Sequence, residues 1–210
     1  MTFPAWDTDL FLFLNGLHSD FFDTLMWYAS AKWTWVPLYV LILFLLYRRL
    51  GWRHFLLMLL GLALCVLLAD RISSGFFKPL FERLRPTHAL GDVVHTVRGY
   101  RGGRCGFVSS HAANMFAIAV YSLLLMRRRH FTVFMLVFAL FVSYSRIYLG
   151  VHYPLDIICG GLLGAGIGWG VAALYRLGAK KLTQRYYMNE ISVAEDFSAA
   201  ELDGKPNITI

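Results

Sequence analysis

Five long apolar stretches constrain this chain more than any other feature of its sequence. They cover residues 27–47, 54–77, 108–126, 131–149 and 155–175. A helix needs about 20 mostly apolar residues to cross a bilayer, and each stretch reaches or approaches that length. Only 16% of the residues are charged, whereas a soluble domain has about 25%. The sequence therefore predicts an all-α integral membrane protein with a bundle of five transmembrane helices.

The two ends of the chain differ from this central domain, which we place at residues 27–186. Within residues 1–26, apolar residues recur at helical spacing among acidic and polar ones: Leu10, Phe11, Leu14, Leu17, Phe21, Phe22 and Leu25. This pattern predicts an amphipathic helix at the membrane interface, or a sixth transmembrane element if the helix enters the bilayer. Residues 187–210 are polar and acidic, without an apolar period, and predict a disordered cytoplasmic tail.

Clusters of Lys and Arg predict the orientation in the membrane, because such residues near span ends stay in the cytoplasm. The clusters follow the first, third and fifth stretches and consist of Arg48, Arg49 and Arg53, then Arg127, Arg128 and Arg129, then Arg176, Lys180, Lys181 and Arg185. Residues 78–107 and 150–154 then face the extracytoplasmic side. Within the fifth stretch, Gly160 and Gly164 have the four-residue spacing that lets two helices pack closely in a membrane. We expect this close packing to occur inside one bundle rather than between two copies of the chain.

Several partner classes are disfavoured by the composition. The net charge of +7 would suit nucleic acid, but the basic residues occur in short clusters between apolar runs. The three cysteines cannot form a disulfide framework, and they show no zinc-binding pattern. We therefore expect the bilayer and a membrane-bound substrate as partners, without nucleic acid. The oligomeric state is not indicated by the sequence.

Three polar groups lie at the ends of the apolar stretches, all on the same predicted membrane face. The first group contains Lys78 and Arg85, the second Ser109, Ser110 and His111, and the third Arg146, His152 and Asp156. Ionisable residues at such positions are costly and usually functional.

Together these residues suit a phosphate ester. The three permanent cations can surround the non-bridging oxygens, and the start of a helix at Ser109 and Ser110 can direct backbone N–H groups at an anion. One imidazole can attack phosphorus while the other protonates the leaving oxygen. A metal ion would be repelled by the cations, so the sequence predicts neither a metal nor a cofactor.

The chain resembles the type 2 phosphatidic acid phosphatase (PAP2) superfamily of membrane lipid phosphatases. Lys78 and Arg85-Pro86 match its first motif, and Ser145-Arg146, His152 and Asp156 match its third with the same spacing. The second motif matches at Ser109 and His111, whereas Val108 replaces the family proline and Ser110 the family glycine.

The resemblance implies a metal-independent phosphatase that forms a phosphohistidine. His152 would be the nucleophile, Asp156 would hold its ring, and His111 would be the general acid and then the general base. Lys78, Arg85, Ser109, Ser110 and Arg146 would bind the phosphate. The more distant loop residues His88, Arg98, Arg101 and Arg104 are candidates for headgroup contacts or for a solvated surface.

The substrate is left open by these motifs. The resemblance offers undecaprenyl diphosphate, phosphatidylglycerol phosphate, phosphatidate and lipid A phosphates, and the extra loop arginines favour undecaprenyl diphosphate. A function of another class, a phosphate transporter or anion channel, would place polar residues along several spans rather than at one end. The size and short loops favour a bacterial inner membrane, with the site on the periplasmic side.

Overall fold

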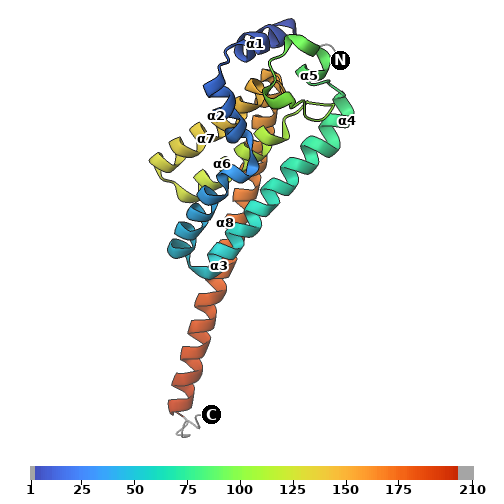
Figure 1. Ribbon diagram of the computed structural model, residues 1–210. Helices are drawn as coiled ribbons and strands as arrows, with labels where there is room; N and C mark the ends of the chain where they lie inside the picture. Colours follow the sequence, from blue (N-terminus) through green and yellow to red (C-terminus); the bar gives the residue numbers. More distant parts are fainter. Residues whose placement is uncertain (1–2, 203–210) are drawn as a thin grey trace.

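The computed structural model describes residues 3–202 and shows a bundle of helices, with no strand among those residues (Figure 1). Its elements are α1 (Ala5–Gly16), α2 (Asp20–Ser30), η1 (Lys32–Trp35), α3 (Val36–Asp70), η2 (Arg71–Phe77), α4 (Lys78–Phe81), α5 (Pro86–Ala89), η3 (Gly91–Val93), η4 (Val97–Gly99), α6 (Ser110–Met126), α7 (Arg129–Tyr148) and α8 (Pro154–Leu202). The predicted all-α membrane architecture is confirmed.

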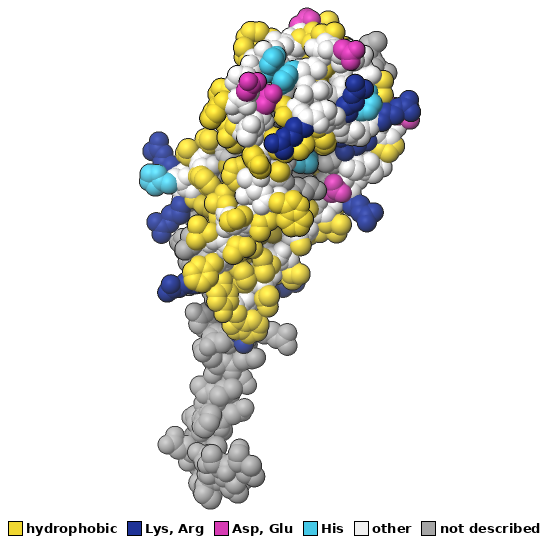
Figure 2. Space-filling view, in the orientation of Figure 1, with side chains coloured by type: hydrophobic (Ala, Val, Ile, Leu, Met, Phe, Trp, Pro, Cys, Tyr) yellow, Lys and Arg dark blue, Asp and Glu magenta, His cyan; other side chains and the backbone are white. Residues whose placement is uncertain are grey.

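Three helices in the described part of the chain are long and apolar enough to cross a membrane: Trp52–Phe81, Arg129–Tyr148 and Pro154–Lys181. A fourth crossing arises if α2 and Trp33–Arg48 are counted as one bent span. Helix α6 is apolar and has 17 residues. Figure 2 shows the matching surface, a broad apolar region, with one group of charged and His side chains at the upper end and further Lys, Arg and His side chains along the edges of the apolar region. The expected number of crossings, five or six, stays a prediction.

The first apolar stretch is bent, whereas the sequence predicted one continuous helix over residues 27–47. Helix α2 ends at Ser30, Ala31 is extended, and the next helix runs at 76° to α2. The Trp35 indole N–H donates to the Ala29 carbonyl across this break at 2.8 Å. Helix α3 then reverses direction between Arg48 and Trp52, so it forms two arms in Figure 1.

The N-terminal segment is two helices, whereas the sequence predicted one amphipathic helix over residues 6–25. The first helix ends at Gly16, and Asn15 in its last turn donates to the Tyr148 carbonyl at 2.8 Å, while Ser19 caps the second helix by accepting from the Phe22 N–H. The apolar face of α1 packs against the bundle, since Phe11 is fully buried against Tyr153. Helix α1 thus lies across the end of the bundle, near α5 (Figure 1).

Helices α6 and α8 pack backbone to backbone along a stripe of glycines. A Cβ atom added to Gly160 would lie 2.6 Å from the Ser109 carbonyl oxygen, and one added to Gly164 would lie 2.1 Å from that of Ala113. Gly168 repeats the pattern one turn further along. The predicted packing inside one bundle is therefore observed, and it fixes the start of α6 against the start of α8.

The far end of α8 extends past the bundle. Its helical backbone continues over residues 187–202, where the sequence predicted disorder, and residues 203–210 of that segment lie outside the described residues. The proposed division of the chain into residues 1–26, 27–186 and 187–210 stays a prediction.

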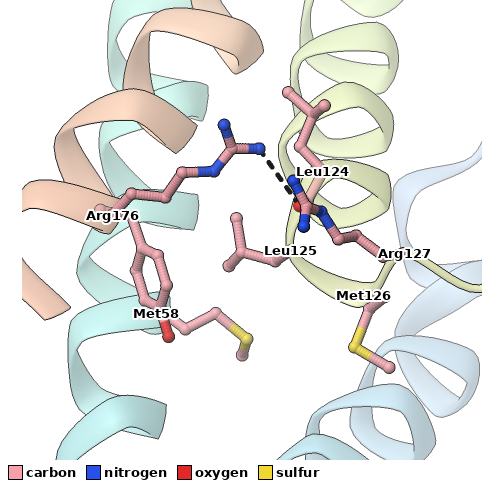
Figure 3. Close-up of a pocket in the computed structure, with 7 residues that line it drawn as sticks. Met58, Leu124, Leu125, Met126, Arg127 and Arg176 are labelled. Carbon is pink, nitrogen blue, oxygen red and sulfur yellow. Dashed lines mark hydrogen bonds between the residues drawn. The ribbon is translucent and has the colours of Figure 1, made fainter. Parts of the chain in front are cut away.

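Two of the predicted cytoplasmic clusters meet at the end of α6. Arg127 and Arg176 point toward one another over a cavity of about 300 Å³, and the Arg176 guanidinium donates to the Leu124 carbonyl at 3.4 Å (Figure 3). These arginines thus stabilise the C-terminal end of α6, where unpaired carbonyl groups carry partial negative charge. They lie at the opposite end of α6 from Ser109 and His111.

Candidate active site

The three polar groups predicted from the sequence meet where α4, α6 and α8 begin or end. The first follows the π-helical segment η2, the second starts α6, and the third lies in the turn between α7 and α8. The glycine stripe brings the second and third together, since the Ser109 N–H donates to the Asp156 carbonyl at 3.0 Å.

His152 and Asp156 form a buried pair. The imidazole Nδ1 lies 3.3 Å from Asp156 Oδ2, and this carboxylate oxygen also accepts from the Tyr153 N–H at 3.1 Å. A carboxylate partner places the proton of a neutral imidazole on Nδ1, which leaves Nε2 with a free lone pair. The pair therefore has the geometry of an oriented nitrogen nucleophile.

The pKa of His152 is lowered well below its usual range. Burial is the largest cause, followed by the positive charges of Arg85, Arg146, Lys78 and Arg83. Because these charges disfavour an additional proton, the imidazole is neutral at physiological pH and Nε2 can attack. The same cations form an anion-binding environment around the ring.

Lys78 is held by a cluster of hydroxyl groups. Its ammonium donates to Ser110 Oγ at 2.8 Å and to Ser74 Oγ at 3.2 Å. Ser73 Oγ is 2.9 Å from Ser110 Oγ, so η2 and the start of α6 meet at this cluster. Ser110, which replaces the family glycine, thus supplies the hydroxyl that contacts the predicted phosphate-binding lysine.

Arg85 and Arg146 are both buried but are held differently. Arg85 Nε donates to the Cys105 carbonyl at 3.2 Å. Arg146 donates to Ser30 Oγ and to the Tyr100 hydroxyl. Its Nε has no hydrogen-bond partner within the described residues, although it is buried. An unpaired buried donor is costly, and a phosphate oxygen would satisfy it.

His111 lies beside the space that a substrate can occupy. It lines a cavity of about 370 Å³ together with Lys78, Ser110 and Ser30, and also a neighbouring cavity of about 250 Å³ with Arg146. This placement suits a group that exchanges a proton with a bound ester.

Ser109 is fully buried, and its N–H and hydroxyl are both hydrogen-bonded within the protein: the N–H donates to the Asp156 carbonyl and Oγ accepts from the Ala112 N–H at 3.4 Å. The structure thus gives Ser109 the role of joining α6 to α8, and its assignment to phosphate stays a prediction.

The four loop candidates are exposed: His88, Arg98, Arg101 and Arg104. Arg98 stacks over the Trp27 ring at 5.0 Å, and the carbonyls of Arg101 and Arg104 accept from Thr87 and the Arg85 N–H. The backbone of this loop therefore supports Arg85, while headgroup contact by these side chains stays a prediction.

Two residues beside the His152–Asp156 pair, Arg83 and Gly106, were not predicted from the sequence. Arg83 Nη1 donates to Asp156 Oδ1 at 2.8 Å. A Cβ atom added to Gly106 would lie 3.0 Å from Asp156 Oδ2 and 3.6 Å from His152 Nδ1, so only glycine leaves the pair undisturbed. Arg83 stands two residues before Arg85 in the sequence, but nothing in that spacing shows that it turns toward Asp156.

The fold and this site together define a membrane-embedded enzyme of phosphate esters. A family model described as "PAP2 superfamily" matches residues 56–179, and the chain belongs to this superfamily. It is a lipid phosphatase of the PAP2 family, the first of the two function classes expected from the sequence.

Curated relatives support this assignment. The chain is 41% identical to the lipid A 4'-phosphatase of Bacteroides thetaiotaomicron over 85% of this chain and 79% of the relative. It is 39% identical to the lipid A 4'-phosphatase of Porphyromonas gingivalis over 80% and 72%, respectively. An undecaprenyl-diphosphatase of Sulfolobus acidocaldarius is 28% identical over 79% of this chain and 76% of the relative.

Solved structures show the same fold. The crystal structure of Aquifex aeolicus LpxE has a TM-score of 0.60 at 23% identity, covering 80% of this chain and 95% of that one. The PAP2 type phosphatidylglycerolphosphate phosphatase of Bacillus subtilis has a TM-score of 0.59 at 22% identity, covering 81% and 87%. At this identity the likeness concerns the fold alone.

Proposed function

We propose that this protein removes the 4'-phosphate of lipid A through a phosphohistidine on His152. The observation that carries the reaction is the buried His152–Asp156 pair, with Nδ1 at 3.3 Å from the carboxylate and cations around the ring. The substrate is supported by the two relatives at 41% and 39% identity, both of which are lipid A 4'-phosphatases.

In the first step, His152 Nε2 attacks phosphorus and a nitrogen–phosphorus bond forms. The bond between phosphorus and the sugar oxygen breaks, and His111 donates its proton to that oxygen. Lys78, Arg85 and Arg146 stabilise the negative charge on the three non-bridging oxygens, and the unpaired Arg146 Nε is available as one of these donors.

In the second step, a water molecule loses a proton to His111 and attacks the phosphohistidine. The nitrogen–phosphorus bond breaks, inorganic phosphate leaves, and His152 returns to its neutral form. The Nδ1 proton remains between His152 and Asp156 throughout, which stabilises the positive charge that develops on the ring.

The cavity beside the site suits a lipid with a sugar headgroup. Trp35, Tyr39 and Ile118 give the cavity an apolar lining, whereas Asp70 and Asn114 contribute polar side chains to it. Asn114 Oδ1 is a buried acceptor with no partner within the described residues. A glucosamine unit offers hydroxyl and amide donors to such oxygens. A second phosphate at neutral pH offers only acceptors and would be repelled by Asp70.

A bacterial inner membrane with the site on the periplasmic side is part of this proposal. It is supported by Arg127 and Arg176 at the opposite end of α6 from the site. Cys105 is half-buried and lies at the same end as the site. A membrane-impermeant maleimide should label it in intact spheroplasts, and labelling that requires permeabilised cells would contradict this orientation.

A substrate panel tests the proposed specificity. Purified protein in detergent should release phosphate faster from lipid A that carries a 4'-phosphate than from lipid A with a 1-phosphate only, phosphatidate or phosphatidylglycerol phosphate. Asp70→Asn should narrow the difference between the rates of phosphate release from lipid A and from undecaprenyl diphosphate. Equal rates on both lipid A phosphates would contradict the proposed position.

Undecaprenyl diphosphate is the second candidate, favoured by the Sulfolobus acidocaldarius relative and by the exposed loop arginines. If it is the substrate, changing Arg98, Arg101 and Arg104 together to Gln should lower diphosphate turnover more than lipid A turnover. The reason is that extra positive charge stabilises a phosphate leaving group. Equal losses would assign these residues to a solvated surface.

A further inference from the structure

Asp7 is a fully buried carboxylate that the reaction steps above do not use. It lies in the first turn of α1, far in sequence from all three motifs, and has no exposed surface. Buried carboxylates are rare because desolvation is costly, and they persist where they are paired and hydrogen-bonded. We therefore expect the buried Asp7 carboxylate to have a cationic partner and hydrogen-bond donors.

Both carboxylate oxygens of Asp7 have such partners. Oδ2 accepts from Arg83 Nη2 at 2.6 Å, and Oδ1 accepts from the Leu155 N–H at 2.8 Å. Leu155 belongs to the first turn of α8, where backbone N–H groups have no partner inside the helix. Asp7 thus joins α1 to the segment after α4 and to the start of α8.

Arg83 connects Asp7 to the nucleophile. One of its terminal nitrogens donates to Asp7 and the other to Asp156 Oδ1 at 2.8 Å, so the guanidinium lies between two carboxylates. The rings of Phe3 and Tyr153 each lie 3.9 Å from its central carbon. The second oxygen of Asp156 contacts His152 Nδ1. The contacts form a continuous chain from Asp7 through Arg83 and Asp156 to His152.

This chain determines the orientation of Asp156. Without Asp7, the guanidinium has a single carboxylate partner and can rotate toward it into a two-pronged pairing, which is the preferred geometry of Arg with a carboxylate. In that pairing, Arg83 would also donate to Asp156 Oδ2, the oxygen that contacts His152 in the structure. The imidazole would then lose the contact that fixes its protonated nitrogen and its direction of attack.

We propose that Asp7 is a positioning residue for the phosphoryl transfer step and that α1 thereby belongs to the catalytic unit. The inference rests on the proposed function, since His152 must be the nucleophile for its orientation to control the rate.

Asp7→Asn tests the inference with little change in volume, and it retains an oxygen that can accept from Leu155. Asp9→Asn is the matched control, because it removes the same charge from an exposed position on the same helix. For Asp7→Asn, kcat should fall by about 10- to 100-fold, as for outer-shell residues that orient a functional histidine, with KM within about twofold. Asp9→Asn should match the wild type in both.

A double-mutant cycle separates positioning from general structural support. If Asp7 acts through Arg83, then Asp7→Asn combined with Arg83→Gln should lower kcat no further than Arg83→Gln alone. Multiplied losses in the double variant, or a changed KM with an unchanged kcat, would overturn the inference. If Asp7→Asn does not purify as folded protein, Asp7→Ser replaces it, because it also removes the carboxylate that pairs with Arg83, and an unchanged kcat for that variant would also overturn the inference.

Activity of the wild-type protein and of His152→Ala separates a failure of the proposed function from a failure of the role of Asp7. Absence of lipid phosphatase turnover, or full activity of His152→Ala, would refute the proposed function itself. Wild-type turnover that depends on His152, with Asp7→Asn as fast as the wild type, would refute only the role of Asp7.

Discussion

Replacing Gly164 with Ala should separate α6 from α8 and inactivate the enzyme. The added Cβ atom would lie 2.1 Å from the Ala113 carbonyl oxygen, 2.8 Å from its carbonyl carbon and 2.9 Å from its Cα. Cβ contacts below 3.0 Å are essentially never observed, so the helices must move apart by at least the difference of 0.9 Å. Backbone atoms form this contact, so no side-chain rotation can relieve it.

The magnitude follows from the geometry of the site. Overpacking of this kind costs about 1–3 kcal/mol of folding stability. The shift also moves the start of α6, which carries His111, away from the start of α8, which Asp156 occupies. A displacement of about 1 Å between reacting groups can cost about 100-fold in rate. We therefore expect kcat to fall by more than the decrease in the folded fraction of the protein can explain.

Gly166→Ala is the matched control, because a Cβ atom at that position would meet nothing within 4 Å. Phosphate release and thermal unfolding in detergent should be measured for both variants. Gly166→Ala should equal the wild type in kcat and be as stable or more stable, since Ala favours helix more than Gly. Wild-type kcat in Gly164→Ala would refute the claim that backbone contact between these helices sets the site geometry.

Three further predictions concern the site. Turnover should survive excess EDTA, since the cations themselves hold the phosphate, and activity that is lost to EDTA and restored by magnesium would contradict this. Ser110→Ala should raise KM by about 3- to 10-fold, because a hydrogen bond that orients Lys78 is worth about 1 kcal/mol; an unchanged KM would argue against it. The lowered pKa of His152 means that below about pH 6.5 the unfolded chain binds a proton that the folded protein does not. The melting temperature should therefore fall from pH 7 to pH 5, and less so in His152→Gln; equal slopes would contradict the assignment.

The helical architecture and the site elements were predictable because their signals are local. Apolar length predicts spans, and the spacing between Arg146, His152 and Asp156 fits a turn between two helices. The sequence also predicted correctly that Gly160 and Gly164 pack within the bundle, since small residues permit close backbone approach in a membrane.

Contacts between distant segments were not predictable in this way. The bond between Asp7 and Leu155 joins residues 148 positions apart, and Asp7 in the sequence is one acid among several on an amphipathic helix. Beside the helix break before Ser19, Asn15 donates to carbonyl groups of Ile147 and Tyr148 at the end of α7. Such helix breaks and buried charges depend on contacts with residues distant in sequence, and the periodicity of a single segment carries no information about those contacts.

The central claim is that His152 carries the phosphoryl group during turnover. Rapid quenching of wild-type protein with lipid A radiolabelled at the 4'-phosphate should trap a protein-bound phosphate that is labile to acid and stable to alkali, as expected for a phosphohistidine. Wild-type protein should retain this label on a peptide containing residue 152, whereas His152→Ala should retain none and release no phosphate. Label or turnover that persists in His152→Ala, or label on His111 instead, would contradict the account.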